Sequence, residues 1–195
     1  MPPKSKYTRE EIISVALDEV RRNGFDALTA RSLAGALGCS PRPIFTVFDS
    51  MDEVQSGVIA AARREYDEYV RVGLTETPAF KGVGTAYIRF ATEQPKLFMM
   101  LFMHDNLGTP SISSALESVD NSADKILNSI VEGYGLGVEV AHKLYMHMWL
   151  YTHGIATLIA NRVCAFSSDD ISNMLTEVFT GLLAKYRTDG EARRQ

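Results

Sequence analysis

Residues 8–48 read TREEIISVALDEVRRNGFDALTARSLAGALGCSPRPIFTVF, and this stretch decides the fold of the N-terminal part of the chain. Its apolar spacing predicts three short helices that are joined by two tight turns. The turn Gly38-Cys39-Ser40 separates the second helix from the third, which is the layout of a helix-turn-helix. A short third helix in this arrangement has the size that fits the major groove of DNA.

Capping residues set the expected bounds of the first two helices. Thr8 and Glu11 form a T-x-x-E capping box that opens the first helix. This helix is expected to end at Asn23-Gly24, with the glycine in the left-handed conformation that often follows a helix. Thr29 is the expected N-cap of the second helix, because its hydroxyl can accept a hydrogen bond from the first turn.

The third helix is expected to begin after Ser40, with Pro41 at its first position and Pro43 still in its first turn. Three apolar residues of this helix are expected to face the core, namely Ile44, Val47 and Phe48. Three others remain on the exposed side, namely Arg42, Phe45 and Thr46. The exposed side is therefore the expected contact with DNA.

The remainder of the chain also shows only helical patterns. They cover about 51–72, 79–104 with a break at Pro95, 111–132, 137–162 and 169–187. The last pattern carries a continuous apolar stripe made of Ile171, Leu175, Val178, Leu182 and Leu183. We find no alternating pattern long enough for a strand, so we expect an all-α protein.

Composition excludes several classes of protein. The chain has 195 residues of which 46% are hydrophobic, enough for a core, but no apolar run approaches the roughly 20 residues that span a bilayer. The start of the chain has no apolar segment typical of a secretion signal. Two distant cysteines, Cys39 and Cys164, suit a reducing compartment. We expect a cytoplasmic protein without a membrane partner.

Charge is distributed unevenly along the chain. Residues 1–48 hold seven basic and five acidic side chains, a net charge of +2, whereas the whole chain carries −4 and the remainder therefore −6. A slightly basic N-terminal part on an acidic body suits nucleic-acid binding that is confined to one end.

The N-terminal part resembles the TetR family of transcriptional regulators. The family pattern appears here as T-R-E-E-I at 8–12, G-F-D-A-L-T at 24–29 and R-S-L-A-G-A-L-G-C-S at 31–40, and it closes at Phe48. Two further segments resemble one group of ligand-binding domains in this family: Y-I-R-F-A at 87–91, followed by E-Q-P at 93–95, and W-x-x-x-H-G at 149–154.

The resemblance implies a specific architecture and function. Residues 1–50 would form the helix-turn-helix DNA-binding domain, and residues 51–195 the ligand-binding and dimerisation domain. The protein would be a homodimer whose last two long helices pair across the dimer. It would act as a ligand-responsive regulator, most often a repressor in this family, which binds a dyad-symmetric DNA operator and is released by a small apolar or aromatic effector. No cofactor and no enzymatic activity are expected.

The sequence departs from the family pattern at three positions. The family commonly has a tyrosine followed two residues later by histidine or tyrosine, where this chain has Phe45 and Val47. It commonly has a lysine three residues after the closing phenylalanine, where this chain has Met51. An alternative reading is therefore a helical protein that binds apolar ligands and whose DNA-binding function is weakened or lost. We see no nucleophile–base constellation that would favour catalysis.

The expected DNA-binding residues fall into two groups. Those around the helix-turn-helix are Thr29, Arg31, Ser40, Arg42, Pro43, Phe45 and Thr46. Those of an N-terminal basic arm are Lys4, Lys6 and Arg9. Arg42 is a reader of guanine, a phosphate contact or a solvated surface arginine, and Thr29 and Ser40 are helix caps with or without a phosphate contact.

The expected effector-binding residues are aromatic, methionine and polar side chains of the body. They are Tyr87, Phe90, Met99, Met100, Met103, Tyr145, Met148, Trp149, Thr152 and His153. Methionines adapt to irregular apolar ligands, and aromatic walls with few polar groups are typical of small-molecule sites. The alternative for each of these residues is a place in an ordinary core. Trp149 and His153 are four residues apart and should share a helix face, but the histidines do not have the spacing of metal ligands.

Overall fold

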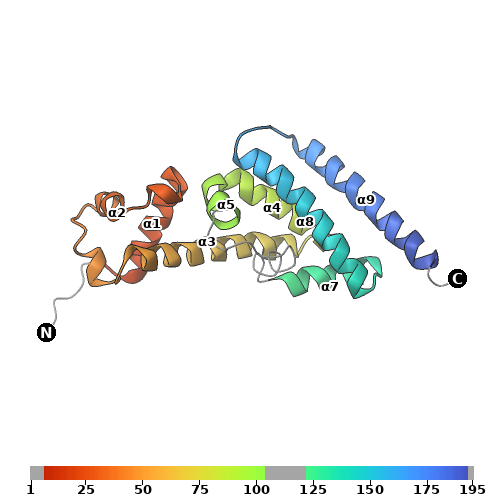
Figure 1. Ribbon diagram of the computed structural model, residues 1–195, viewed down its shortest axis with the longest axis horizontal. Coiled ribbons are helices and arrows are strands. Elements are labelled where there is room, and N and C mark those ends of the chain that lie inside the picture. Colours follow the sequence, from red (N-terminus) through yellow and green to blue (C-terminus); the bar gives the residue numbers. More distant parts are fainter. Residues whose placement is uncertain (1–6, 104–121, 193–195) are drawn as a thin grey trace. The chain divides into compact units, whose positions relative to one another are not determined.

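The computed structural model describes residues 7–103 and 122–192, and all regular structure in these ranges is helical (Figure 1). In the N-terminal part the elements are α1 (Arg9–Asn23), η1 (Phe25–Ala27), α2 (Ala30–Ala36) and η2 (Ile44–Thr46). They are followed by α3 (Met51–Gly73), α4 (Ala79–Glu93), α5 (Pro95–Phe102), α7 (Ala123–Tyr134), α8 (Val138–Ala160) and α9 (Ser168–Ala192). The expected all-α fold is confirmed, as is the break before Pro95.

The described residues form two compact units. One contains residues 7–66 and 94–103, and the other contains residues 67–93 and 122–192. The boundary between these units does not coincide with the expected domain boundary at residue 50. Most of α3 and the whole of α5 belong with the N-terminal helices. We call them the first unit and the second unit. Whether residues 1–50 act as a separate DNA-binding domain stays a prediction.

The core of the first unit is built from one face of α1 and the apolar residues that follow it. Ile12, Ala16 and Val20 lie on one side of α1 and are completely buried. Leu33 of α2 and Ile44 of η2 are buried as well. The helix α1 packs against α2 and α5. The capping box predicted for α1 is present, since Thr8 Oγ1 accepts from Glu11 N at 3.1 Å and Glu11 Oε2 accepts from Thr8 N at 2.7 Å.

The third element of the helix-turn-helix is shorter than the sequence predicts. No α-helix begins after Ser40, and the segment forms turns and one stretch of 3₁₀ helix, η2. The physical reason is Pro43, whose ring disfavours the α conformation at the preceding residue, Arg42. Of the three side chains expected to face the core, Ile44 and Phe48 are buried, with Phe48 N donating to Ile44 O at 3.0 Å, whereas Val47 is only partly buried.

One other local expectation also needs correction. Gly24 follows α1 with a positive φ of 91°, but its ψ of 165° is extended and not left-handed helical. Ser50 Oγ accepts from Glu53 N at 3.3 Å at the start of α3, and the Glu53 carboxylate accepts from the backbone N–H of Asp49 at 2.8 Å. The predicted helix at 111–132 lies partly outside the described residues, and within them α7 begins at Ala123 and ends at Tyr134.

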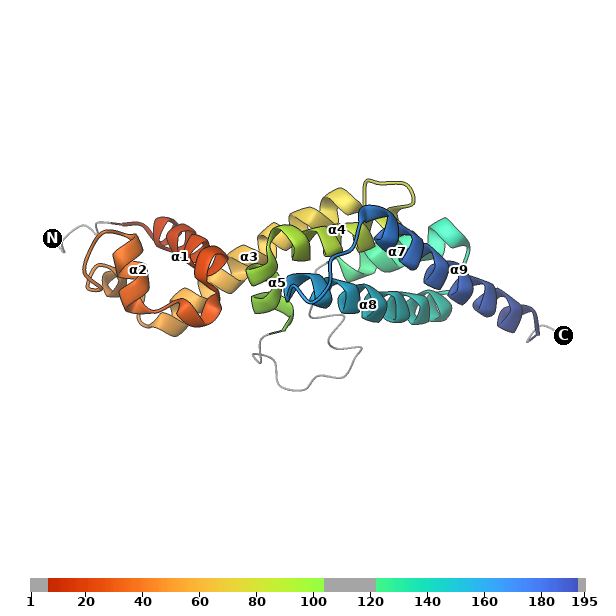
Figure 2. The same cartoon turned by 90° about the horizontal axis from the view of Figure 1, so that it is seen from above.

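The second unit is a layered helical bundle. The long helix α8 packs against α4, α7 and α9, and α4 also packs against α7 (Figure 2). Its buried side chains include Phe80 and Phe90 of α4, Ile126 and Ile130 of α7 and Leu144 of α8. None of the helices described is both long and apolar enough to cross a membrane.

Two glycines allow α3 and α4 to approach closely within the second unit. A Cβ placed on Gly73 would lie 2.7 Å from the carbonyl oxygen of Gly82, and a Cβ on Gly82 would overlap the carbonyl oxygen of Gly73. Neither position leaves room for a side chain without a backbone shift. The connection between α3 and α4 therefore depends on both glycines.

Candidate functional site

An exposed edge of the first unit carries the predicted DNA-reading side chains. Arg42, Phe45 and Thr46 are exposed, with 45% of Phe45 accessible, while Ile44 between them is fully buried. Thr46 Oγ1 donates to Pro43 O at 2.6 Å, which fixes its side chain. Arg42 forms no ion pair within residues 7–103 and 122–192. This edge, which we call the reading edge, thus keeps a cation and an aromatic ring available.

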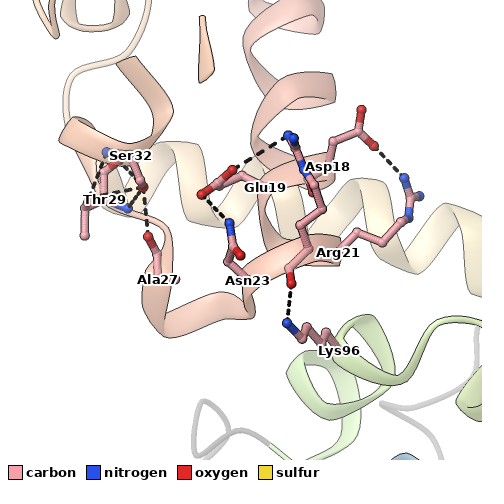
Figure 3. A network of polar contacts seen from close by, with 9 residues as sticks. Asp18, Glu19, Arg21, Asn23, Ala27, Thr29, Ser32 and Lys96 are labelled. Atoms are coloured by element: carbon pink, nitrogen blue, oxygen red, sulfur yellow. Dashed lines mark hydrogen bonds and ion pairs between the residues drawn. The ribbon is translucent and has the colours of Figure 1, made fainter. Parts of the chain in front are cut away.

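The start of α2 is held by a network between Thr29, Ser32 and Ala27 (Figure 3). Thr29 Oγ1 accepts from Ser32 N at 3.1 Å, and Ser32 Oγ accepts from Thr29 N at 2.9 Å. Thr29 is therefore a true helix cap, and it is also exposed. Arg31 in the first turn of α2 is exposed too. A phosphate contact at Thr29 or Arg31 stays a prediction, as it does at the exposed Ser40.

Arg9 belongs to the first turn of α1 and not to a flexible arm. Its Nη1 lies 2.7 Å from Oε1 of Glu53, and its guanidinium stands over the ring of Phe48 at 4.4 Å from the ring centroid. The N–H of Asp49 and the hydrogen bond from Arg9 lower the pKa of Glu53. Arg9 thus ties α1 to α3 beside the reading edge. The other two residues of the predicted arm, Lys4 and Lys6, lie outside the described residues.

Arg21 at the end of α1 joins three parts of the first unit. Its Nη1 lies 2.6 Å from Asp18, its Nη2 lies 2.5 Å and 2.7 Å from the oxygens of Glu65 in α3, and its Nε donates to Gln94 Oε1 at 2.9 Å. Burial alone would lower the pKa of Arg21, but the hydrogen bonds and charges of Glu65 and Asp18 outweigh it and raise the pKa.

Contacts of α5 strengthen this connection. Lys96 donates to the backbone carbonyl of Arg22, as Figure 3 shows beside Arg21 and Asp18. Phe102 meets Tyr66 of α3 edge-on, with ring centroids 5.1 Å apart. Sequence reasoning missed this network, because Glu65 and Gln94 lie 44 and 73 residues from Arg21 and no local pattern pairs them.

The second unit brings together three of the predicted effector-binding residues. Tyr87 of α4 is buried, and its hydroxyl lies 2.8 Å from Nδ1 of His153 in α8. The imidazole of His153 stacks on the indole of Trp149 with centroids 5.1 Å apart and an angle of 17° between the rings. Burial lowers the pKa of His153, so the neutral imidazole is favoured. The shared helix face of Trp149 and His153 is confirmed.

The other predicted effector-binding residues divide between the two units. Those of the second unit are all buried, namely Phe90, Tyr145, Met148 and Thr152. Those of the first unit are the buried Met100 and the exposed Met99 and Met103. Their role in effector binding stays a prediction. No group of three or more His, Cys, Asp or Glu side chains suited to a metal ion occurs in the part of the chain that the structure describes.

Sequence reasoning missed a further polar residue of α8. Thr157 follows His153 by one helical turn, and its hydroxyl is buried without a hydrogen-bond partner in the described structure, as is Nε1 of Trp149. The spacing of Trp149, His153 and Thr157 at every fourth position could have indicated this residue, since such positions share a helix face.

Comparison with known proteins identifies the class. A family model described as the tetracyclin repressor-like, C-terminal domain matches residues 80–186, which is more than half of the chain. The chain therefore belongs to the TetR family of transcriptional regulators. It is also 26% identical over 197 aligned positions to Rv0681, an uncharacterized HTH-type transcriptional regulator of Mycobacterium tuberculosis. That alignment covers 97% of this chain and 84% of the relative.

Proposed function

We propose that this protein is a homodimeric, ligand-responsive transcriptional regulator, and most simply a repressor. It would bind a dyad-symmetric DNA operator through the two reading edges of the dimer and leave it when a small apolar or aromatic effector occupies the second unit. The observation that carries this proposal is the reading edge itself, where Arg42, Phe45 and Thr46 are exposed over the buried Ile44. A helix-turn-helix uses such side chains to reach base edges in the major groove.

Base recognition at the reading edge depends on Arg42. Its guanidinium can donate two hydrogen bonds to O6 and N7 of a guanine. Thr46 can contact a thymine methyl group or a phosphate, and the backbone N–H groups at the start of α2 next to Thr29 can meet phosphate oxygens. These contacts would set the register of each half-site, and the two-fold symmetry of the dimer would set the spacing between half-sites.

Dimer formation would use α8 and α9. Val138, Leu150 and Leu158 of α8 are exposed in the single chain, and Leu175 is the one residue of the apolar stripe on α9 that is buried. Two-fold association is the commonest way in which a soluble protein covers such a surface. Light scattering at micromolar concentration should give twice the monomer mass. Leu158→Glu should shift the mass toward the monomer, whereas Ala36→Glu at an exposed position of α2, outside the proposed interface, should not.

Effector binding must act through a difference in affinity for two conformations of the dimer. The chain runs from the first unit to the second within α3, between Tyr66 and Asp67, and returns between Glu93 and Gln94. Arg21 binds the side chains of Glu65 and Gln94, beside both of these points. We therefore assign α3, Pro95 and Arg21 to the mechanical link between effector and DNA.

The experiment that tests the proposal is a binding titration with the DNA upstream of the protein's own gene, against scrambled DNA of equal length. Specific binding that decreases when an effector is added supports it. The alternative function is a helical protein that binds apolar ligands with weakened or lost DNA binding, which is favoured by Phe45 and Met51 in place of the usual tyrosine and lysine. Equal affinity for specific and scrambled DNA, with ligand binding retained, would favour that alternative.

A further inference from the structure

Two buried polar atoms on α8 have no hydrogen-bond partner among the described residues. They are Nε1 of Trp149 and Oγ1 of Thr157. Nearly all buried polar groups in folded proteins are hydrogen-bonded, so each exception calls for an explanation, and a bound molecule is one such explanation. The indole N–H can only donate, so its partner must be an acceptor. The hydroxyl of Thr157 can donate or accept.

The hydroxyl of Thr157 behaves differently from those of other helical threonines in this chain. Four of them donate to the backbone carbonyl four residues earlier, namely Thr92, Thr176, Thr180 and Thr188. Such back-bonding is the usual solution for a threonine inside a helix. Thr157 makes no such bond in the described structure, although its Oγ1 is buried. This hydroxyl is therefore left without a partner in its own helix.

The two unpartnered atoms lie along one side of α8 with His153 between them. Trp149, His153 and Thr157 follow one another at intervals of four residues, and the Trp149 and His153 rings are stacked. At a rise of roughly 1.5 Å per residue, positions 149 and 157 are about 12 Å apart along the helix axis. A molecule in contact with both would be elongated and would lie beside a flat aromatic surface.

The surroundings disfavour a charged molecule. Residues 149–157 read WLYTHGIAT and contain no Asp, Glu, Lys or Arg, and Lys143 pairs with Glu139 near the start of α8, away from them. Tyr87 beside His153 is buried, and so are Ile155 and Ala156. Burial also lowers the pKa of His153, so this region does not readily carry positive charge. An ion placed here would lose its hydration without gaining a counter-charge.

We propose that the effector is a neutral, elongated aromatic molecule with a hydrogen-bond acceptor for Nε1 of Trp149 and a second polar group for Oγ1 of Thr157. This inference rests on the proposed function of the second unit as the effector-binding part of a regulator. The proposed function allows any small apolar or aromatic effector. The present inference restricts it to uncharged molecules with a polar group at each end.

The direct test uses the indole N–H of Trp149, because this is the only tryptophan of the chain. The ¹⁵N-labelled full-length protein should show one indole signal, which is titrated with 2-acetonaphthone, 2-ethylnaphthalene and 2-naphthoate. The ketone should move the indole proton downfield and bind about tenfold more tightly than the hydrocarbon, as one additional hydrogen bond allows. The naphthoate anion should bind more weakly than the ketone, because its charge must be buried.

Two variants test the contact of Trp149 and the contact of Thr157 with the probe separately. Trp149→Phe keeps an aromatic ring and removes the donor, so it should abolish the preference for the ketone over the hydrocarbon. Thr157→Val keeps the shape and removes the hydroxyl. It should abolish the additional affinity of 6-acetyl-2-naphthol over 2-acetonaphthone. Thr188→Val, whose hydroxyl is bonded to Ala184 O, is the matched control and should leave that difference unchanged.

Three outcomes would overturn the proposed effector class. They are equal binding of ketone and hydrocarbon without an indole shift, tighter binding of the anion, and no binding of any probe at millimolar concentration. Circular dichroism checks that each variant is folded, and the indole shift in the unmodified protein does not depend on a variant. If the ketone binds with the expected shift but leaves DNA affinity unchanged, the effector class stands and the proposed release from DNA fails.

Discussion

Arg21 Nε donates to Gln94 Oε1 over 2.9 Å, so the end of α1 is bonded to the residue that precedes Pro95 and α5. The same guanidinium holds Glu65 of α3 with two contacts of 2.5 Å and 2.7 Å. One side chain thus connects α1 with α3 and with the start of α5. Its loss should affect both the stability of the first unit and the transmission of effector binding.

Replacing Arg21 by Met should destabilise the protein by about 1 kcal/mol, because a half-exposed ion pair contributes up to about that amount and the bidentate geometry is favourable. The matched control is Arg71→Met, which breaks a more exposed pair with Glu68 three residues earlier. That change should cost clearly less, because both partners are exposed to solvent. Urea unfolding of both variants measures the difference. Equal losses would show that Arg21 has no special structural role.

Gly82→Ala should destabilise the second unit by at least about 2 kcal/mol, because its new methyl group would meet the backbone of Gly73. Gly84→Ala, two residues later in the same helix, is the control. Its Cβ would have no neighbour closer than 4.0 Å, and alanine is the better helix former by about 1 kcal/mol. Thermal unfolding should show a lower melting temperature for the first variant and an unchanged or higher one for the second.

Stability should depend on pH through His153. Its pKa in the folded protein is lowered from the ordinary value of 6.5 by burial, so the unfolded chain takes up a proton at a higher pH than the folded protein does. The stability that this neutral histidine contributes is complete above about pH 6.5 and is lost as the pH falls toward the lower folded pKa.

The variant His153→Phe lacks this titration. Its melting temperature should therefore decrease less than that of the unmodified protein when the pH is lowered from 7.5 to 5.5. Parallel pH curves for the two proteins would contradict the assignment and would mean that His153 is accessible to protonation in the folded state.

Local patterns predicted the helices of this chain better than they predicted the site. Capping residues such as Thr8 and Thr29 act within one turn, so the starts of α1 and α2 could be predicted from sequence. The short η2 was not predicted, because the proline at position 43 restricts its neighbour more strongly than the apolar spacing favours an α-helix.

Contacts between residues far apart in the sequence were the part of the site that the sequence did not predict. The shared helix face of Trp149 and His153 follows from their spacing and was predicted, whereas the stacking of their rings was not. The hydrogen bond between Tyr87 and His153 joins residues 66 positions apart, and only the packing of α4 on α8 brings them together. Both tyrosine and histidine were expected near an effector, but nothing in the sequence pairs them. The same holds for Arg21 with Gln94.

DNA affinity provides the last prediction. Phe45 and Met51 replace a phenol and an ammonium that commonly contact phosphate in this family, so each monomer of the proposed dimer should make fewer phosphate contacts. Each lost contact removes close to one unit from the slope of log affinity against log salt concentration. We therefore expect binding that is specific but comparatively weak, with a shallow dependence on salt.

Two substitutions distinguish a phosphate contact, which does not depend on DNA sequence, from a base contact, which does. Met51→Lys, at the first residue of α3, should tighten binding to matched and unmatched DNA alike and steepen the salt slope by about one unit per monomer. Arg42→Ala should instead cost roughly 1–3 kcal/mol per monomer and relax discrimination at one base pair of each half-site. Anisotropy titrations over a range of salt concentrations measure both effects. An unchanged salt slope in the first variant, together with an equal loss on all sequences in the second, would show that Arg42 is a phosphate contact and that the start of α3 does not approach DNA.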